Sequence, residues 1–375
     1  MPCDYDALPH AGIRTLIPYI PGKSADALSH EKSLTNIIKL ASNENPLGCS
    51  PLVIEALSHL TGHKIATYPM SINHPLREKL AVKLGVDAPM VTLGNGSDSL
   101  FCLLLTCFAL HTGRHVITHD YAFSSYAIQA KTLGIPVVST VVYGNWAVDI
   151  DAMIAACDDK TALVFIANPN NPTGLRVNDS DIERLLKAIP VSTILVLDEA
   201  YCEFDHNHRQ AFSISLLSTY PNLVITRTFS KAYGLASLRL GYAIAHPQIT
   251  ALLYRIQLPF VVNIAAMIAA DAALDDDDFI AQTIEMTGHG LKQMQAGLNT
   301  LGLTHNNPTM ATNFITMDCG TDSMPVYNAL QEHGIIVRPL HPYGLKHYLR
   351  VTIGTEEQNN RFLDALSITL KRGSR

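Results

Sequence analysis

Lys231, which lies between small hydroxyl residues and a glycine, has the clearest chemistry of any residue in this sequence. It belongs to the stretch Thr228-Phe-Ser-Lys-Ala-Tyr-Gly-Leu235, which follows an apolar run, and Arg239 comes eight residues after the lysine. A lysine amine can form a Schiff base with an aldehyde, while Thr228, Ser230 and Arg239 could hold a phosphate. The alternative is a surface lysine on a turn, since a Ser-Lys pair alone is a weak signal. The other polar clusters of the chain decide between these two interpretations.

Asp198, at the end of another apolar run, supplies a second chemical group. The run Ile194-Leu-Val-Leu leads into Asp198, and Tyr201 follows three residues later. A buried carboxylate needs a partner, and a protonated pyridine nitrogen would serve, because the carboxylate would keep that ring an effective electron acceptor. Tyr201 could donate its hydroxyl group to a phenolic oxygen on the same ring. A helix-capping aspartate is the alternative, and the presence of Lys231 argues against it.

Two turns rich in glycine, asparagine and proline precede these residues. Gly94-Asn-Gly-Ser-Asp98 follows a predicted strand and opens a helix, a position where backbone N–H groups can bind an anion. A dinucleotide-binding motif is not indicated, because Ser99 stands where the third glycine belongs; an ordinary strand–helix turn stays open as an alternative. Asn168-Pro-Asn-Asn-Pro-Thr-Gly174 fixes a sharp, non-helical path and aims amide side chains at the end of a strand.

Short apolar runs alternate with amphipathic segments between about residues 90 and 245. The predicted strands are Met90–Leu93, His115–Thr118, Pro136–Val142, Ala162–Ala167, Thr193–Leu197, Leu223–Thr226 and Gly241–Ala245. The predicted helices are Ser99–Ala109, Ser125–Leu133, Ile150–Ala156 and Ser180–Ala188. This alternation predicts a doubly wound α/β domain with a mainly parallel sheet, in which ligands bind at the carboxyl ends of the strands.

The pattern changes after residue 259 and predicts a second, smaller α/β domain. Two long helices, Pro259–Leu274 and Phe279–Leu301, precede a smaller α/β pattern and a final helix from Glu356 to about Leu370. The segments of the smaller pattern are Thr312–Met317, Val326–His333, Ile335–Pro339 and Leu349–Ile353. The run Asp275–Asp278 is best explained as a turn that caps the second long helix. We expect the first ~45 residues to pack on this domain or on a partner subunit.

The composition indicates a globular protein of the cytoplasm. Hydrophobic residues make up 47% of the 375 and charged residues 16%, and the net charge of −6 gives no general attraction to nucleic acid. The longest apolar stretch is too short to cross a membrane. Seven scattered cysteines, none in a C-x-x-C pair, favour free thiols over disulfides or structural zinc. His206 and His208 form the one H-x-H pair, but no third ligand accompanies them, so we expect no metal site.

Taken in order, the glycine-rich turn, the Asn-Pro turn, Asp198 with Tyr201, and Lys231 with Arg239 resemble the fold-type I pyridoxal-phosphate aminotransferases. More narrowly, four segments look like the histidinol-phosphate aminotransferases: Leu40-Ala-Ser-Asn-Glu-Asn-Pro-Leu-Gly48, Thr67-Tyr-Pro69, Gly94–Asp98 and Leu349-Arg-Val-Thr-Ile-Gly-Thr355. The resemblance runs from about Ile17-Pro-Tyr19 to the C-terminal helix. It implies a large domain over residues 46–262 with a mainly parallel seven-stranded sheet flanked by helices. A small α/β domain over residues 263–375 and an N-terminal segment over residues 1–45 complete the chain.

The resemblance also assigns roles to individual residues. Lys231 would form the Schiff base with pyridoxal 5'-phosphate and move the proton in the reaction, and Asp198 would pair with the pyridinium nitrogen. The other cofactor contacts would come from Ser97, Asp98, Thr228, Ser230 and Arg239 at the phosphate, Asn171 and Tyr201 at the phenolic oxygen, and Phe123 stacked on the ring. Tyr68 would reach the phosphate in the neighbouring subunit of a homodimer. Arg350, Arg338, Tyr19 and Asn43 would bind the substrate.

The resemblance implies reversible transamination between histidinol phosphate and 2-oxoglutarate, a step of histidine biosynthesis. Arginines suit both substrates, because a guanidinium group binds carboxylate or phosphate through two parallel hydrogen bonds. Two alternatives stay open: an aromatic amino-acid aminotransferase that accepts Phe or Tyr, and a lyase like threonine-phosphate decarboxylase. A binding protein without catalytic activity would leave Lys231 unexplained.

Overall fold

The computed structural model describes residues 3–5, 7–17, 23–70, 74–205, 210–306 and 311–373. Tyr19, His206 and His208, which the sequence singled out, lie outside the described residues. Within them, three sheets are present, of seven, four and two strands. No helix among these residues combines the length and apolar character needed to cross a membrane.

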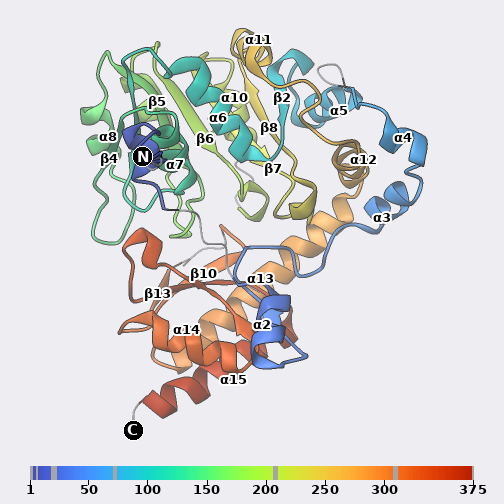
Figure 1. Cartoon of the computed structure of the whole chain (residues 1–375), viewed down its shortest axis with the longest axis vertical. Coiled ribbons are helices and arrows are strands. Elements are labelled where there is room, and N and C mark those ends of the chain that lie inside the picture. Colours follow the sequence, from blue (N-terminus) through green and yellow to red (C-terminus); the bar gives the residue numbers. More distant parts are fainter. Residues whose placement is uncertain are drawn as a thin grey trace.

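A seven-stranded sheet forms the upper half of the molecule in Figure 1. Its spatial order is β2-β8-β7-β6-β5-β3-β4, and only β8 runs antiparallel to its neighbours. The bounds of these strands are β2 Val91–Gly94, β3 His115–His119, β4 Val137–Thr140, β5 Thr161–Ala167, β6 Ile194–Asp198, β7 Leu223–Thr228 and β8 Gly241–Ala245. The sequence-based prediction of a mainly parallel seven-stranded sheet is therefore confirmed.

Helices cover both faces of this sheet because alternate strand residues point to opposite sides. On one face Val164, Ile166 and Leu195 belong to a buried cluster with residues of α5, α8, α9 and α12; on the other, Leu163 and Phe165 pack with α6, α7 and α11. These helices are α5 Pro75–Leu84, α6 Ser97–Phe108, α7 Ser125–Thr132, α8 Ile150–Ala156, α9 Asp179–Ala188, α11 Pro247–Ile256 and α12 Ile264–Ala273. Two short helices, α3 Pro51–Ser58 and α10 Gln210–Leu216, add Val53 and Leu216 to the first cluster. Two others, α1 Ala11–Arg14 and α4 Gly62–Ala66, add no residue to either cluster.

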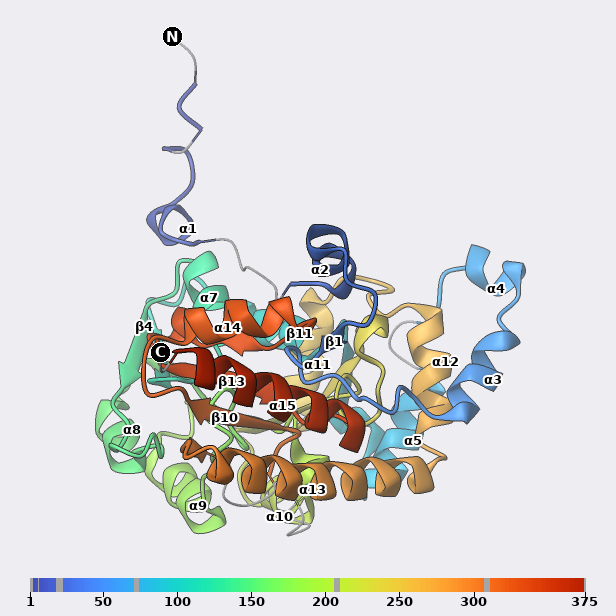
Figure 2. The same ribbon diagram turned by 90° about the horizontal axis from the view of Figure 1, so that it is seen from below.

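A four-stranded antiparallel sheet lies in the lower half, in the order β12-β13-β10-β9. Its strands are β9 His305–Asn306, β10 Phe314–Asp318, β12 Arg338–Pro339 and β13 Tyr348–Thr352. Figure 2, the view from below, shows α13 Asp277–Thr300, α14 Ser323–Glu332 and α15 Glu356–Gly373 across this sheet. The N-terminal part of the chain contributes here too: α2 is Ala25–Lys32, and β1 Ile38–Lys39 pairs in parallel with β11 Ile335–Ile336.

Most predicted element boundaries differ from the observed ones by a few residues, and three differences have a visible structural cause. The strand predicted to reach Val142 ends at Thr140, because its partner β3 ends at the paired His119. The helix predicted from Pro259 begins at Ile264, where the Asn263 side chain accepts a hydrogen bond from the backbone N–H of Ala266. The segment predicted as one strand, Ile335–Pro339, forms two short strands in different sheets.

Two contacts join the upper and lower halves beside the site described below. The Trp146 ring packs edge-on against Tyr348 of β13, with ring centres 4.5 Å apart, and lies 5.8 Å from the Tyr121 ring. Tyr343, which follows β12, donates a hydrogen bond to Ser124 Oγ at 3.4 Å. The lower half therefore contacts the upper half at two places: Tyr348 of β13 meets Trp146 after β4, and Tyr343 meets Ser124 at the start of α7.

Candidate active site

A cavity of about 250 Å³ opens at the carboxyl ends of β5, β6 and β7. The last residues of these three strands, Ala167, Asp198 and Thr228, all line it. Ten residues predicted from the sequence lie around the cavity: Ser97, Asp98, Phe123, Asn171, Asp198, Tyr201, Thr228, Ser230, Lys231 and Arg239. Parallel strands end at one edge of the sheet, so residues spread over more than a hundred positions meet there.

Lys231 lies in the loop after β7, with its amine exposed to the cavity. Its Nζ donates a hydrogen bond to the carbonyl oxygen of Ser42 at 3.1 Å and lies 5.7 Å from the centre of the Tyr201 ring. Burial, followed by the positive charge of Arg350, lowers the pKa of Lys231 to about 8. About a tenth of the amine is thus neutral at pH 7, the form that attacks a carbonyl, far more than for an ordinary lysine.

Asp198 ends β6 and is 4% exposed. Its Oδ2 accepts a hydrogen bond from the Tyr126 hydroxyl at 2.6 Å; its Oδ1 accepts from the Ala200 N–H at 3.2 Å and the Thr226 hydroxyl at 3.3 Å. Burial raises the pKa of Asp198 to about 7, although the bond from Tyr126 opposes this shift. A cationic ring nitrogen in the cavity would favour the ionised carboxylate.

The opposite end of the cavity suits a phosphate group. Gly96 precedes α6 and has no side chain to cap it, so the first backbone N–H groups of α6 are available to an anion. Thr228, Ser230 and Arg239 add two hydroxyl groups and a guanidinium group at the same end. Gly96 is required here: its φ is +74°, and a Cβ would lie 2.7 Å from Arg239 Nη2.

Arg350 on β13 reaches across to the larger sheet. Its Nη1 donates to Asn171 Oδ1 at 2.5 Å, and its Nη2 donates to the carbonyl oxygen of Ala41 at 2.7 Å. Since the amide oxygen of Asn171 is occupied by Arg350, its NH₂ group is the part left to donate to a ligand. Asn43 Nδ2 donates to the Tyr201 hydroxyl at 2.8 Å, which orients that hydroxyl at the cavity wall.

Four predicted residues are not among the described residues that line the cavity: Asn43, Arg350, Arg338 and Tyr68. Asn43 and Arg350 contact lining residues, as described above. Arg338 on β12 is paired directly opposite Arg350. Tyr68 is 82% exposed and stacks on Phe260 with ring centres 4.6 Å apart.

The sequence-based reasoning missed several residues of this site. Ser42 and Glu44 line the cavity. Glu44 forms an ion pair with Lys39, whose Nζ lies 2.8 Å from Glu44 Oε1. Tyr126 was also missed, although it stands three residues after Phe123 at the start of a helix. Phe123 lies just before the helix and Tyr126 in its first turn, and their rings meet edge-on with centres 5.6 Å apart.

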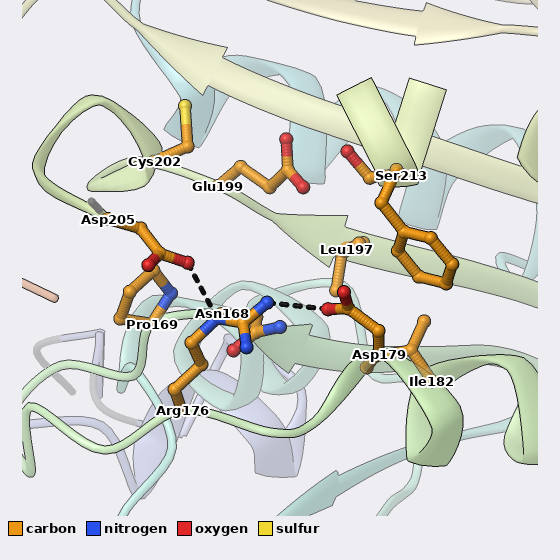
Figure 3. A pocket seen from close by; sticks show the side chains of 11 residues that line it. Asn168, Pro169, Arg176, Asp179, Ile182, Leu197, Glu199, Cys202, Asp205 and Ser213 are labelled. Carbon is orange, nitrogen blue, oxygen red and sulfur yellow. Dashed lines mark hydrogen bonds and ion pairs between the residues drawn. The ribbon is translucent and has the colours of Figure 1, made fainter. Parts of the chain in front are cut away.

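Charged side chains line a second, smaller pocket beside Asn168 and Pro169 of the Asn-Pro turn, as Figure 3 shows. Arg176 lies between two carboxylates, with its Nε 2.7 Å from Asp205 Oδ2 and its Nη2 2.5 Å from Asp179 Oδ1. Arg227 and Glu199 form a second buried pair, at 2.7 Å and 2.8 Å. Because an unpaired buried charge is costly, these pairs hold the Asn-Pro turn and the segment after Asp198 in place.

Comparison with known proteins agrees with this geometry. The family model "Aminotransferase class I and II" matches residues 35–366. Two proteins named histidinol-phosphate aminotransferase 2 are similar to the whole chain. The one from Legionella pneumophila (strain Lens) is 56% identical over 366 residues, 98% of this chain and 99% of the relative. The one from Pseudomonas aeruginosa is 42% identical over 369 residues, with the same coverage.

A similar protein has been solved with its cofactor bound. The crystal structure of histidinol-phosphate aminotransferase from Sinorhizobium meliloti in complex with pyridoxal-5'-phosphate matches with a TM-score of 0.87 and 26% sequence identity, over 98% of each chain. The cavity fits this cofactor, since it offers an amine, a buried carboxylate and an anion-binding helix end. The chain therefore belongs to the class I and II aminotransferases and is a pyridoxal-phosphate-dependent aminotransferase.

Proposed function

We propose that this enzyme catalyses the reversible transamination of histidinol phosphate with 2-oxoglutarate, a step of histidine biosynthesis. The observation that supports the substrate class is a pair of arginines on neighbouring strands, of which Arg350 contacts the cavity-lining residue Asn171. Arg338 and Arg350 are directly opposed across β12 and β13, so their side chains leave the same face of that sheet. Like charges in this arrangement repel, and a bound carboxylate or phosphate relieves the repulsion.

The family resemblance and the positions of these residues around the cavity support the proposed roles of the cofactor-binding residues. Pyridoxal phosphate supplies an aldehyde that captures the substrate amine and a pyridine ring that accepts its electrons. Lys231 holds the cofactor and moves a proton through its Nζ between the two carbon atoms that exchange the amino group. Asp198 keeps the ring nitrogen protonated, and Asn171 and Tyr201 donate to the phenolic oxygen.

The remaining proposed contacts fix the position of the cofactor. Ser97, Asp98, Thr228, Ser230 and Arg239 bind its phosphate, and Phe123 stacks on one face of the ring. An aromatic face is sufficient for stacking, so a phenylalanine serves here without a hydroxyl group. On the substrate side, we propose that Arg350, Arg338, Asn43 and Tyr19 bind the two substrates in turn.

Single-turnover half-reactions test the proposed substrate. The cofactor-loaded enzyme is mixed separately with histidinol phosphate, glutamate, phenylalanine and threonine phosphate, and the loss of its visible absorbance is followed. We expect the first two amino donors to react fastest. A faster reaction with phenylalanine would identify an aromatic aminotransferase instead. Release of carbon dioxide from threonine phosphate without 2-oxoglutarate would identify a lyase.

We also propose a homodimer in which Tyr68 contacts the cofactor phosphate of the partner subunit. The surface around Tyr68 is largely apolar, since Leu60, Ile65, Phe260 and Val261 line one surface depression with it. Subunits carrying Lys231→Ala mixed with subunits carrying Tyr68→Ala test this arrangement. A mixed dimer would contain one site with both residues intact, so activity should reappear on mixing. No recovery in a mixture shown to contain mixed dimers would contradict a shared site.

Two further proposals concern organisation and location. We propose that residues 46–262 form the large domain, and that residues 263–375 form the small one with residues 1–45 packed beside it or on the partner. The pairing of β1 with β11 supports the place of the N-terminal segment. We propose a cytoplasmic location, supported by the free thiols of all seven cysteines.

A further inference from the structure

Tyr126 is a buried residue that the roles proposed above do not use. It is 1% exposed, and its hydroxyl donates to Asp198 Oδ2 at 2.6 Å. A hydrogen bond from a neutral hydroxyl to an ionised carboxylate is about twice as strong as one between neutral groups. Tyr126 is thus well placed to act on the cofactor through Asp198 without lining the cavity itself.

Three aromatic rings fix the direction of the Tyr126 hydroxyl. The Tyr126 ring stacks on Phe165 of β5, with ring centres 4.8 Å apart, and meets Phe101 of α6 edge-on at 5.0 Å. Phe123, the proposed stacking ring of the cofactor, meets it edge-on at 5.6 Å. With its ring held on these sides, the tyrosine presents its hydroxyl to Asp198 in one orientation, so the carboxylate need not reorganise when a ligand binds.

The other groups around Asp198 do not replace this bond. Thr226 on β7 and the Ala200 N–H both donate to Oδ1, at longer distances of 3.3 Å and 3.2 Å. Asp98 on α6 is negatively charged and opposes ionisation of Asp198. The Tyr126 hydroxyl is therefore the closest donor to the carboxylate, and it serves the oxygen that no other side chain of the described residues is shown to serve.

We propose that Tyr126 is a positioning residue, whose hydroxyl holds Asp198 as an ionised and correctly oriented acceptor for the protonated ring nitrogen of the cofactor. This inference rests on the role proposed above for Asp198. In Tyr126→Phe, the carboxylate loses its nearest donor. Its attraction for a cationic nitrogen then weakens, while the shape of the aromatic cluster is preserved.

The test compares two cofactors by calorimetric titration of the apoenzyme. One is pyridoxal phosphate, and the other is its carbocyclic analogue, in which a CH group replaces the ring nitrogen. Loss of a hydrogen bond to a charged group should weaken binding of pyridoxal phosphate to Tyr126→Phe on the order of 10- to 100-fold. Binding of the analogue should change little, because the analogue offers Asp198 no cation.

Equal losses of affinity for both cofactors would overturn the proposal, because Tyr126 would then act only on the shape of the site. Unchanged affinity for both cofactors would also overturn it, because Tyr126 would then have no effect on binding. Equal affinity of the wild-type enzyme for both cofactors would overturn the role of Asp198 itself, which distinguishes the two failures. Tyr254→Phe is the matched control, because it removes a tyrosine hydroxyl that donates to Val91 O at 3.0 Å, away from the site.

Thr226→Val provides a second, independent variant. It removes the hydroxyl that donates to Asp198 Oδ1. Because the Thr226 hydrogen bond is longer than that of Tyr126, we expect a smaller loss of affinity for pyridoxal phosphate. The affinity for the analogue should again stay unchanged. If Thr226→Val weakened binding more than Tyr126→Phe, the dominant position assigned to Tyr126 would be wrong.

Discussion

The two walls of the active site are built in different ways. The cofactor wall belongs to the seven-stranded sheet, and its predicted side chains line the cavity at strand ends. The wall that we propose to bind the substrates, called the substrate wall below, combines the segment after β1 with β12 and β13 of the four-stranded sheet. Its Arg350 is bonded to Asn171 and to the backbone of Ala41, and Arg338 lies off the cavity.

This difference matches two different tasks. A resident cofactor is served best by groups that are already in place, because preorganised dipoles need no rearrangement during the reaction. Two substrates that alternate at one site instead need a cation that can exchange partners, and a guanidinium group bonded to neutral acceptors can do so. We therefore expect substitutions on the cofactor wall to affect every substrate alike. Substitutions on the substrate wall should discriminate between substrates.

Among substitutions on the cofactor wall, Lys231→Ala should reduce turnover the most. We expect turnover to fall on the order of 10⁴-fold or more with every substrate, because both the covalent attachment and the proton carrier are lost. Loss of the visible absorbance of the lysine-bound cofactor and single-turnover rates measure the effect. Lys160→Ala, which alters an exposed lysine, is the control. Retained turnover would remove the basis of the proposed mechanism.

Asp198→Asn should have the next largest effect and should again be uniform. The amide keeps the shape of the side chain but cannot pair with a cationic nitrogen, so we expect kcat to fall about 10²- to 10³-fold with histidinol phosphate and glutamate alike. Steady-state kinetics with both substrates measure it. A loss confined to one substrate would mean that Asp198 belongs to the substrate wall.

Arg350→Leu should reduce kcat/KM for glutamate by about 10²-fold, because a buried, hydrogen-bonded guanidinium partner of the carboxylate is removed. Affinity of the apoenzyme for pyridoxal phosphate, measured by titration, should change much less than that. A large loss of cofactor affinity would show that the Arg350–Asn171 contact serves the cofactor wall. That result would contradict the division of the site into a cofactor wall and a substrate wall.

Arg338→Leu should separate phosphorylated from unphosphorylated substrates. We expect kcat/KM for histidinol phosphate to fall about tenfold or more, and that for phenylalanine to stay nearly constant, because only the former offers a phosphate to the guanidinium group. Competition between the two substrates in one reaction measures the ratio directly. Equal losses would favour an aromatic aminotransferase.

The smallest expected effect links the two walls through pH. The pKa of Lys231 is about 8, so capture of pyridoxal phosphate by the apoenzyme should accelerate with rising pH and level off above that value. The positive charge of Arg350 lowers this pKa, so in Arg350→Leu the pKa rises and the midpoint moves to higher pH. Stopped-flow absorbance measures the profile. Arg184→Leu, on the surface, should leave the midpoint unchanged.

The cofactor wall could be predicted from the sequence because several of its residues stand at the ends of apolar strand segments. Asp198 and Thr228 each end an apolar run, and the topology of a parallel sheet brings such ends together. Gly241–Ala245 and Ile150–Ala156 were predicted with their observed bounds. The general fold followed from the same alternation of strands and helices.

The remaining features depend on contacts that no local pattern encodes. The bond between Tyr126 and Asp198 joins residues 72 positions apart, and that between Arg350 and Asn171 spans 179 positions. Ile335 and Arg338, three positions apart, belong to different sheets, because Ile335 pairs with β1 and Arg338 pairs with β13. Pairing partners of very short strands are set by tertiary packing and not by propensity.

Trp146 gives the molecule an intrinsic optical reporter. It is the sole tryptophan of the chain, and it touches Tyr348 on β13 and lies near Tyr121, at the junction of the two walls. Its fluorescence therefore comes from this junction alone and needs no attached dye. An emission spectrum that shifts when substrate is added would record a displacement between the walls, and a constant spectrum would record a rigid junction.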